Sequence, residues 1–124
     1  MNDQTKRRIA FYRRTATEST VNGNSSESQL VALRKRLAES PGAVLAGDYE
    51  DSGVSGTVKL AERPAGARLC RDAALGIFDE VWATSPSRLG RKLVDTLDLA
   101  DFFSRLGAHL DVLEIRETGT GETQ

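Results

Sequence analysis

The chain has 124 residues, of which 39% are apolar and 28% charged, and its formal net charge is −1. This length and composition suit one globular domain with a hydrophobic core, and we expect no second domain. A nearly neutral chain does not coat nucleic acid by bulk attraction, so any binding to nucleic acid must use local basic patches. The single cysteine, Cys70, excludes an internal disulfide.

Other functional classes are disfavoured by what the sequence lacks. His109 is the only histidine, and no Cys/His cluster has the spacing of metal ligands, so we expect no metal and no cofactor. No apolar stretch approaches the ~18 residues of a membrane span, and residues 1–6 lack the core of a signal peptide. We therefore expect a cytoplasmic protein with no membrane partner.

The first part of the chain predicts a strand, a loop and a helix. Residues 9–12 form a short apolar run typical of a buried strand. Residues 15–28 are rich in Ser, Thr, Asn and Gly and predict a mobile loop. The helix that follows ends at Pro41-Gly42, and Ser26 with Gln29 near its start resembles a capping box. Its apolar stripe consists of Leu30, Leu33 and Leu37.

The middle of the chain repeats this order. Residues 43–49 predict a second strand, which leads into a loop at residues 50–61. A second helix is predicted from Arg63-Pro64 to Gly76, because proline is well tolerated in a first helical turn. Residues 78–83 predict a third strand, with Asp79 near its start ordering the local backbone.

The last part predicts a helix ending at Gly107 and a fourth strand at residues 109–115. Strands that alternate with helices imply right-handed crossovers. We therefore predict an α/β fold, with an open, mostly parallel sheet of four to five strands and helices on both faces. The domain is placed at residues 1–117, and residues 118–124 are expected to be a frayed tail.

A basic segment precedes the third helix. Arg88, Arg91 and Lys92 are predicted in its first turn, where each cation opposes the helix dipole by about 0.3 to 1 kcal/mol. Gly90 inside the helix would cost about another 1 kcal/mol. Such local violations tend to mark functional sites. Unpaired N–H groups beside two guanidinium groups form a receptor for phosphate or another anion.

The carboxyl ends of the strands are the expected binding edge of an open α/β sheet. On an extended first strand Tyr12, Arg14 and Ala16 face one way, so Arg14 can join Arg88 and Arg91 around one anion. Phosphoryl transfer requires that the negative charge of the phosphate be stabilised, and three arginines can do this without a metal ion. A structural ion pair of Arg14 with Glu50 or Asp51 is the alternative.

The sequence resembles the serine site-specific recombinases, the family of resolvases, invertases and large integrases, over nearly the whole chain. The matching pieces occur in family order at suitable spacing. They are Tyr12-Arg13-Arg14-Thr15-Ala16-Thr17, Gln29, Asp51-Ser52-Gly53-Val54-Ser55-Gly56, Arg63-Pro64, Gly76 with Asp79, and Ser87-Arg88-Leu89-Gly90-Arg91.

The resemblance implies a resolvase-like fold and a mechanism. In this family a serine attacks the scissile DNA phosphate, giving a phosphoserine link and a free 3′-hydroxyl, and a tetramer exchanges strands without metal. It implies that Arg14, Arg88 and Arg91 bind the phosphate, with Gln29 and Arg63 in support. The nucleophile position falls on Ala16, so the covalent step is expected to be absent from this chain.

Two further departures from the family pattern bear on function. Many members have Asp where this chain has Ser87, which as a good N-cap would change the catalytic network more than the fold. Members also continue into a long dimerisation helix and a DNA-binding region, whereas this sequence stops at Gln124. We expect weak DNA binding by this chain, and a homo-oligomer, dimer to tetramer, for the full-length protein.

Alternative interpretations stay open. The chain could be a non-catalytic pseudo-recombinase that acts as a regulatory or scaffold partner, or an unrelated flavodoxin-like or receiver-type domain. Arg63 could be an exposed residue before a proline, and Gln29 only a cap. The run Arg34-Lys35-Arg36 is interpreted as a solvated helix face rather than a DNA contact.

Overall fold

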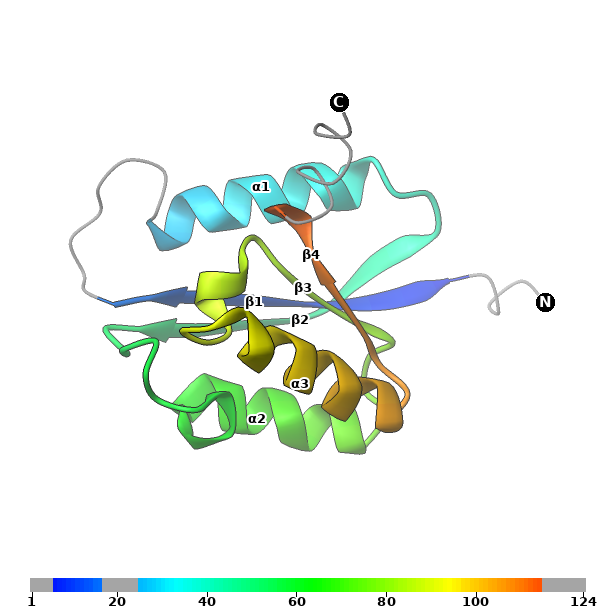
Figure 1. Ribbon diagram of the computed structural model, residues 1–124. Coiled ribbons are helices and arrows are strands. Elements are labelled where there is room, and N and C mark those ends of the chain that lie inside the picture. Colours follow the sequence, from blue (N-terminus) through cyan, green and yellow to red (C-terminus); the bar gives the residue numbers. More distant parts are fainter. Residues whose placement is uncertain (1–5, 17–24, 115–124) are drawn as a thin grey trace, which may run out of the picture.

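The computed structural model describes residues 6–16 and 25–114, whose strands form one parallel sheet (Figure 1). The four strands of this described part are ordered β2-β1-β3-β4, and β1 pairs with both β2 and β3. This confirms the predicted α/β class. The strands are β1 (Arg7–Thr15), β2 (Ala43–Ser52), β3 (Glu80–Ala83) and β4 (His109–Val112).

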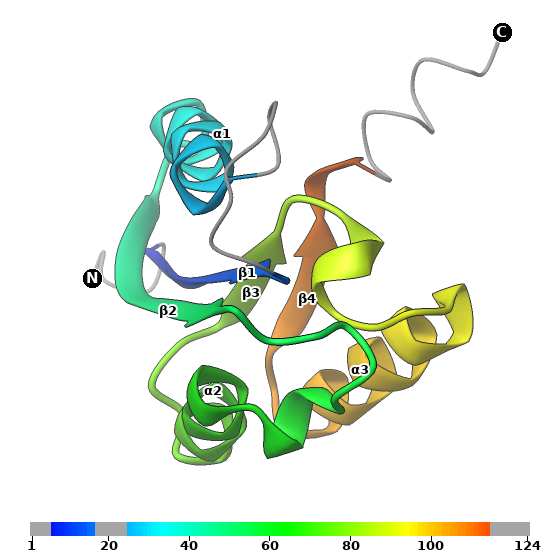
Figure 2. The same ribbon diagram turned by 90° about the vertical axis from the view of Figure 1, so that its left-hand side faces the viewer.

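Helices cover both faces of the sheet, as predicted. Figure 2 shows α1 on one side and α2 with α3 on the other. The helices are α1 (Ser26–Ala38), α2 (Pro64–Ala74) and α3 (Leu93–Arg105), and two short 3₁₀ turns are η2 (Leu60–Glu62) and η3 (Pro86–Arg88).

Two hydrophobic clusters follow from the alternation of side chains along β1. Ile9 and Phe11 face α1 and pack with Leu33 and Trp82. Ala10 and Tyr12 face the opposite way and join the cluster under α2 and α3. The polar residues that follow, Arg13 and Arg14, are also buried, at 9% and 6% exposure. The strand therefore carries two arginines into the interior at its carboxyl end.

The start of α1 differs from the sequence prediction. Its N-cap is Ser25, whose side chain accepts a hydrogen bond from the Ser28 N–H, so the predicted capping box at Ser26 is wrong. Gln29 is buried and is not a capping residue. Most of the predicted mobile loop, with Thr17, lies outside the described residues, as do the tail and the proposed domain end at residue 117.

The basic segment also differs from its prediction, because it lies outside α3. Arg88 belongs to the separate turn η3, and α3 begins only at Leu93, after Gly90 and Arg91. The Asp95 side chain accepts a hydrogen bond from the Lys92 N–H at 3.0 Å, which satisfies one of the N–H groups at the start of α3. A Cβ on Gly90 would collide with this carboxylate side chain. The predicted dipole penalty therefore does not arise, and Gly90 is required for close packing.

Candidate active site

Arg14 lies at the carboxyl end of β1 and joins two loops that are distant in sequence. Its guanidinium donates hydrogen bonds to the Val54 carbonyl at 2.6 Å and to the Ser87 carbonyl at 2.8 Å. The first loop is also tied to the strand, because the Val54 N–H donates to the Thr15 carbonyl at 3.0 Å. Arg14 thus fixes the loop after β2 and the turn η3 at one edge of the sheet.

Arg14 makes no ion pair with a carboxylate in the part of the chain that the structure describes, although the charge of Asp51 acts on it at longer range. The predicted alternative pairing with Glu50 or Asp51 is therefore wrong. Burial lowers the pKa of Arg14, and the positive charges of Arg63 and Arg88 lower it further. Such an environment favours an anion that arrives from outside.

Arg88 and Gln29 meet at the main chain of Arg14. The Arg88 Nη1 donates to the Arg14 carbonyl at 3.2 Å. The Gln29 amide spans the same residue, donating to its carbonyl at 3.0 Å and accepting its N–H at 3.2 Å. Burial lowers the pKa of Arg88, and the nearby Glu114 opposes that effect. The sequence-predicted pair of arginines is thus brought together, and Gln29 holds the backbone between them.

Arg63 is fully buried, so its interpretation as an exposed residue is wrong. Its Nη1 donates to the Arg88 carbonyl at 2.6 Å, and its Nη2 donates to the Leu89 carbonyl at 3.0 Å. Its Nε donates to the Val58 carbonyl at 2.8 Å. Arg63 therefore fixes the backbone that carries Arg88 and contributes a positive charge beneath it.

Asp51 and Tyr12 form the floor of the site, a role the sequence analysis missed. The Tyr12 hydroxyl donates to Asp51 at 2.8 Å and accepts from Arg63 at 3.0 Å. Asp51 also accepts the N–H groups of Ala65 and Gly66 at the start of α2. Asp51 ends a predicted strand, and the next helix begins at a proline. This combination could have indicated that the Asp51 carboxylate caps the first turn of that helix.

Ala16 is exposed just beyond the end of β1, adjacent in sequence to the strand that carries Arg14. Ser87 lies within η3, so its predicted role as an N-cap is wrong. Its carbonyl accepts Arg14, and its hydroxyl lies 3.0 Å from that of Ser85. Position 16 thus presents a methyl group to solvent at the edge where two guanidinium groups converge.

Two predicted site residues lie elsewhere. Arg91 is exposed and lines a separate cavity of about 460 Å³ between residues 56–61 and the start of α3. Asp79 lies before β3 at the opposite edge of the sheet, where it accepts the N–H of Arg8 at 2.8 Å and pairs with its guanidinium. These contacts fix the backbone at the start of β3. They also place Asp79 at the edge of the sheet opposite to Arg14.

Within residues 6–16 and 25–114, no three His, Cys, Asp or Glu side chains gather in a way that could hold a metal ion. The helices of this same part are too short or too polar to cross a membrane. What the site offers chemically is guanidinium charge and backbone-fixed geometry, which suit binding of a phosphate group.

Comparison with known proteins agrees with this arrangement. A protein of Bacillus subtilis (strain 168) named "Putative DNA recombinase" is 40% identical over 94 residues, which are 75% of this chain and 18% of that protein. The chain therefore spans less than a fifth of this relative.

Solved structures have the same fold. The N-terminal catalytic domain of TP901-1 integrase matches with a TM-score of 0.76 and 36% identity, over 86% of this chain and 78% of that one. A resolvase family site-specific recombinase from Streptococcus pneumoniae matches with a TM-score of 0.70 and 24% identity, over 88% and 73%, and supports the fold alone.

The family model described as the resolvase N-terminal domain matches residues 9–124. The match covers the strand with Arg14 and Ala16, the buried Arg63 and the turn with Arg88. The chain therefore belongs to the serine recombinase, or resolvase, family, and corresponds to the catalytic domain of that family.

Proposed function

We propose that this chain is the catalytic domain of a serine site-specific DNA recombinase in which Ala16 occupies the nucleophile position, so that the chain as written cannot cleave DNA. The observation that carries the proposal is the meeting of Arg14 and Arg88 beside an exposed Ala16. Two guanidinium groups at one strand end suit a phosphodiester, and a methyl group cannot attack phosphorus.

The chemistry of a completed site follows from its charge. A serine hydroxyl at position 16 would attack the scissile phosphate, forming an O–P bond while the bond to the 3′-oxygen breaks and leaves a 3′-hydroxyl. Arg14 and Arg88 stabilise the negative charge that builds on the phosphate oxygens. Gln29 and Arg63 position these two residues through the backbone. Arg91 is a third phosphate ligand in this proposal and would reach the DNA from its own exposed position.

The whole protein is proposed to bind DNA and to act as a homo-oligomer, dimer to tetramer. The relatives of this chain include a DNA recombinase and an integrase by name. The arginines of one domain contact a single phosphate, and exchange of strands requires that several such sites cleave together. This chain alone is expected to bind DNA weakly, since one local patch neutralises few phosphates.

The test restores the nucleophile. Ala16→Ser is introduced into a chain that includes the dimerisation and DNA-binding regions, and the protein is incubated with its recombination site. The expected result is a covalent protein–DNA adduct that survives denaturing electrophoresis, with release of a 3′-hydroxyl end. The unaltered chain should give none.

Two matched variants sharpen this experiment. Ala16→Ser combined with Arg88→Gln should bind the site but lose at least a hundredfold in adduct formation, because the transition-state charge loses a ligand. Ala16→Gly controls for the change at position 16 without a hydroxyl. A lack of adduct from Ala16→Ser, under conditions where the protein is bound to its site, would reject the proposal.

A second candidate function is that of a non-catalytic partner for an active recombinase. The observation that favours it is the pairing of two departures, Ala16 and Ser87, with an otherwise intact arginine site. Such a protein would join an active recombinase on DNA and change its rate. Co-purification with an active recombinase, and a change in its product yield on addition of this chain, would support this candidate. Full restoration of cleavage by Ala16→Ser alone would favour the first.

A further inference from the structure

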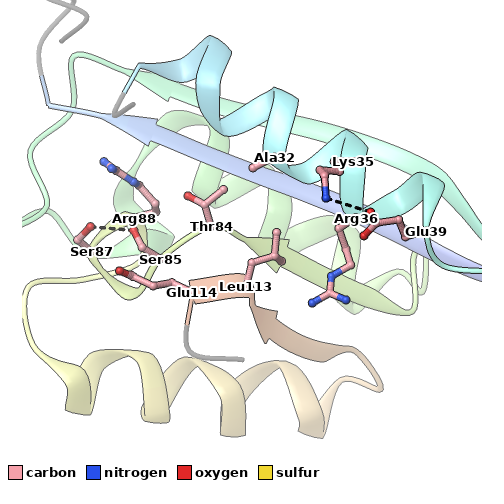
Figure 3. Close-up of a pocket in the computed structure, with 10 residues that line it drawn as sticks. All are labelled: Ala32, Lys35, Arg36, Glu39, Thr84, Ser85, Ser87, Arg88, Leu113 and Glu114. Carbon is pink, nitrogen blue, oxygen red and sulfur yellow. Dashed lines mark hydrogen bonds and ion pairs between the residues drawn. The ribbon is translucent and has the colours of Figure 1, made fainter. Parts of the chain in front are cut away.

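A cavity adjoins the proposed phosphate site but belongs to a different part of the surface. It has a volume of about 560 Å³ and lies between α1 and the segment that links β3 to η3 (Figure 3). In this view Arg88 lies at one end and Arg36 at the other. Thr84 lies between them, and the hydroxyl-bearing Ser85 and Ser87 line the cavity at the Arg88 end.

Arg36 is the residue that gives this cavity a chemical character. It is partly buried and extends from α1 toward Leu113 across the cavity (Figure 3). Across the described ranges, its guanidinium makes no hydrogen bond or ion pair. By contrast, its neighbour Lys35 is paired with Glu39 at 3.0 Å. A partly buried guanidinium that no carboxylate satisfies is suited to bind an anion.

Arg34, Lys35 and Arg36 were predicted to form one solvated helix face, but their side chains have different surroundings in the structure. Arg34 is exposed and does not line the cavity, whereas Arg36 does. The two residues carry the same charge on the same helix and differ only in direction. This difference supplies a matched control for any test of the cavity.

The spacing between the two ends suits a polymer. Gln29 and Arg88 contact the same carbonyl of Arg14, and Arg36 follows Gln29 by seven positions on α1. Seven residues of a helix that rises about 1.5 Å per residue span about 10 Å. One strand of B-form DNA covers that length in about three nucleotides. From this helical rise we expect the two arginines to contact different phosphates of one nucleic-acid strand.

Two carboxylates also line the cavity and oppose an anion. Glu39 is largely neutralised by Lys35. Glu114 is anchored by its own N–H, which donates to the Thr84 carbonyl at 2.8 Å, and its side chain lies at the cavity wall (Figure 3). Removal of the Glu114 charge should therefore strengthen anion binding in the cavity, whereas removal of the Arg36 charge should weaken it.

We propose that this cavity is a second phosphate subsite, in which Arg36 binds a backbone phosphate of the same DNA strand whose scissile phosphate lies at Arg14 and Arg88. The Thr84 hydroxyl group lies between the two subsites, beside the expected path of the intervening backbone. The inference rests on the proposed function, since it extends the bound strand from that site along α1.

The test measures binding of fluorescein-labelled thymidine oligonucleotides of two and six nucleotides to the 124-residue chain at low salt. Arg36→Gln should weaken binding of the hexanucleotide about threefold to tenfold, the loss expected for one charge-assisted contact. It should leave the dinucleotide unchanged, because that probe cannot reach from Arg88. Arg34→Gln should leave both within about twofold, and Glu114→Gln should tighten the hexanucleotide.

Each outcome decides between the proposals. Equal effects of Arg36→Gln and Arg34→Gln, with binding still lost in Arg88→Gln, overturn the second subsite and leave the proposed function intact. Binding that is insensitive to Arg14→Gln and Arg88→Gln overturns both. A titration with inorganic phosphate tests whether the cavity is instead a site for a free anion. If Arg36→Gln weakens the binding of inorganic phosphate but not of the hexanucleotide, the proposal is also overturned. The expected pattern includes a salt slope that is lower by about 0.7 in Arg36→Gln.

Discussion

Both edges of the sheet carry arginines, but the guanidinium groups have different hydrogen-bond partners at the two edges. At the amino edge Arg7 pairs with Glu80 at 2.7 Å and Arg8 pairs with Asp79 at 2.8 Å. At the carboxyl edge Arg14 and Arg63 donate mainly to backbone carbonyls. Carboxylates pair with both arginines at the first edge. At the second edge Asp48 and Glu50 pair with Arg13, whereas carbonyls fix the geometry of Arg14 and Arg63 without an ion pair in the described residues. We therefore expect an anion to bind at the second edge, beside Arg14.

The largest expected effect comes from the deepest arginine. Arg63→Met removes the donor of several buried carbonyls and of the Tyr12 hydroxyl. We expect a loss of about 3 to 5 kcal/mol in the free energy of unfolding, measured by urea denaturation, because the partners stay buried without a donor. Arg8→Met at the exposed edge should cost much less, because solvent screens its ion pair with Asp79. Similar losses for the two variants would remove the distinction between the edges.

Asp51, a buried carboxylate at the carboxyl edge that stabilises the fold, offers the next largest test. The two Asp51 oxygens accept the N–H groups of Ala65 and Gly66, and Asp51→Asn replaces one of these acceptors with an NH2 donor. We expect a loss of about 2 kcal/mol in urea denaturation. Glu62→Gln, an exposed change nearby, should stay within about 0.5 kcal/mol. An unchanged Asp51→Asn variant would show that these contacts do not stabilise the start of α2.

The sequence predicts the strands and helices well because their apolar patterns are local. The apolar run at residues 9–12 and the stripe of Leu30, Leu33 and Leu37 correctly indicate β1 and α1. The apolar run marks only residues 9–12 of β1, and the extension of the strand through Arg14 was predicted from the expected binding edge. Arg13 stays in the strand because Asp48 pairs with it, and Arg14 stays there because Gln29 binds its backbone. Both contacts are nonlocal.

The site was predicted in part for the same reason. The structure brings the predicted Arg14 and Arg88 together, because the first lies at the carboxyl end of β1 and the second follows that of the neighbouring β3, and their role at a phosphate stays a prediction. The start of α3 was placed too early, since only the tertiary packing of Gly90 against Asp95 reveals the turn between η3 and the helix. The burial of Arg63 could not be read from the sequence, because its partners are carbonyls, which every residue possesses. The binding of the same phosphate by Arg91 together with Arg14 and Arg88 stays a prediction.

Sulfate offers a smaller and more direct test of anion binding beside Arg14. At about ten times its dissociation constant, bound sulfate should stabilise the chain by about 1.4 kcal/mol, seen as a rise in Tm over chloride at equal ionic strength. Arg14→Gln should lose most of that rise, and Arg8→Gln should keep it. A rise that survives in Arg14→Gln would place the anion elsewhere on the molecule.

The smallest effect belongs to the amino edge, where carboxylates pair with both arginines. The hydrogen bond from Arg8 lowers the pKa of Asp79. A carboxyl with a lowered pKa in the folded state stabilises the protein above its unfolded pKa of about 3.9, and this stabilisation is lost as the pH falls through the folded value. Because both side chains are substantially exposed, Asp79→Asn should cost less than about 1 kcal/mol at pH 7. Urea denaturation should show the difference between wild type and Asp79→Asn shrinking below pH 4 and in high salt. A difference that stays constant from pH 7 to pH 3 would mean that Asp79 acts through packing, and that the two edges do not differ in how their charges are satisfied.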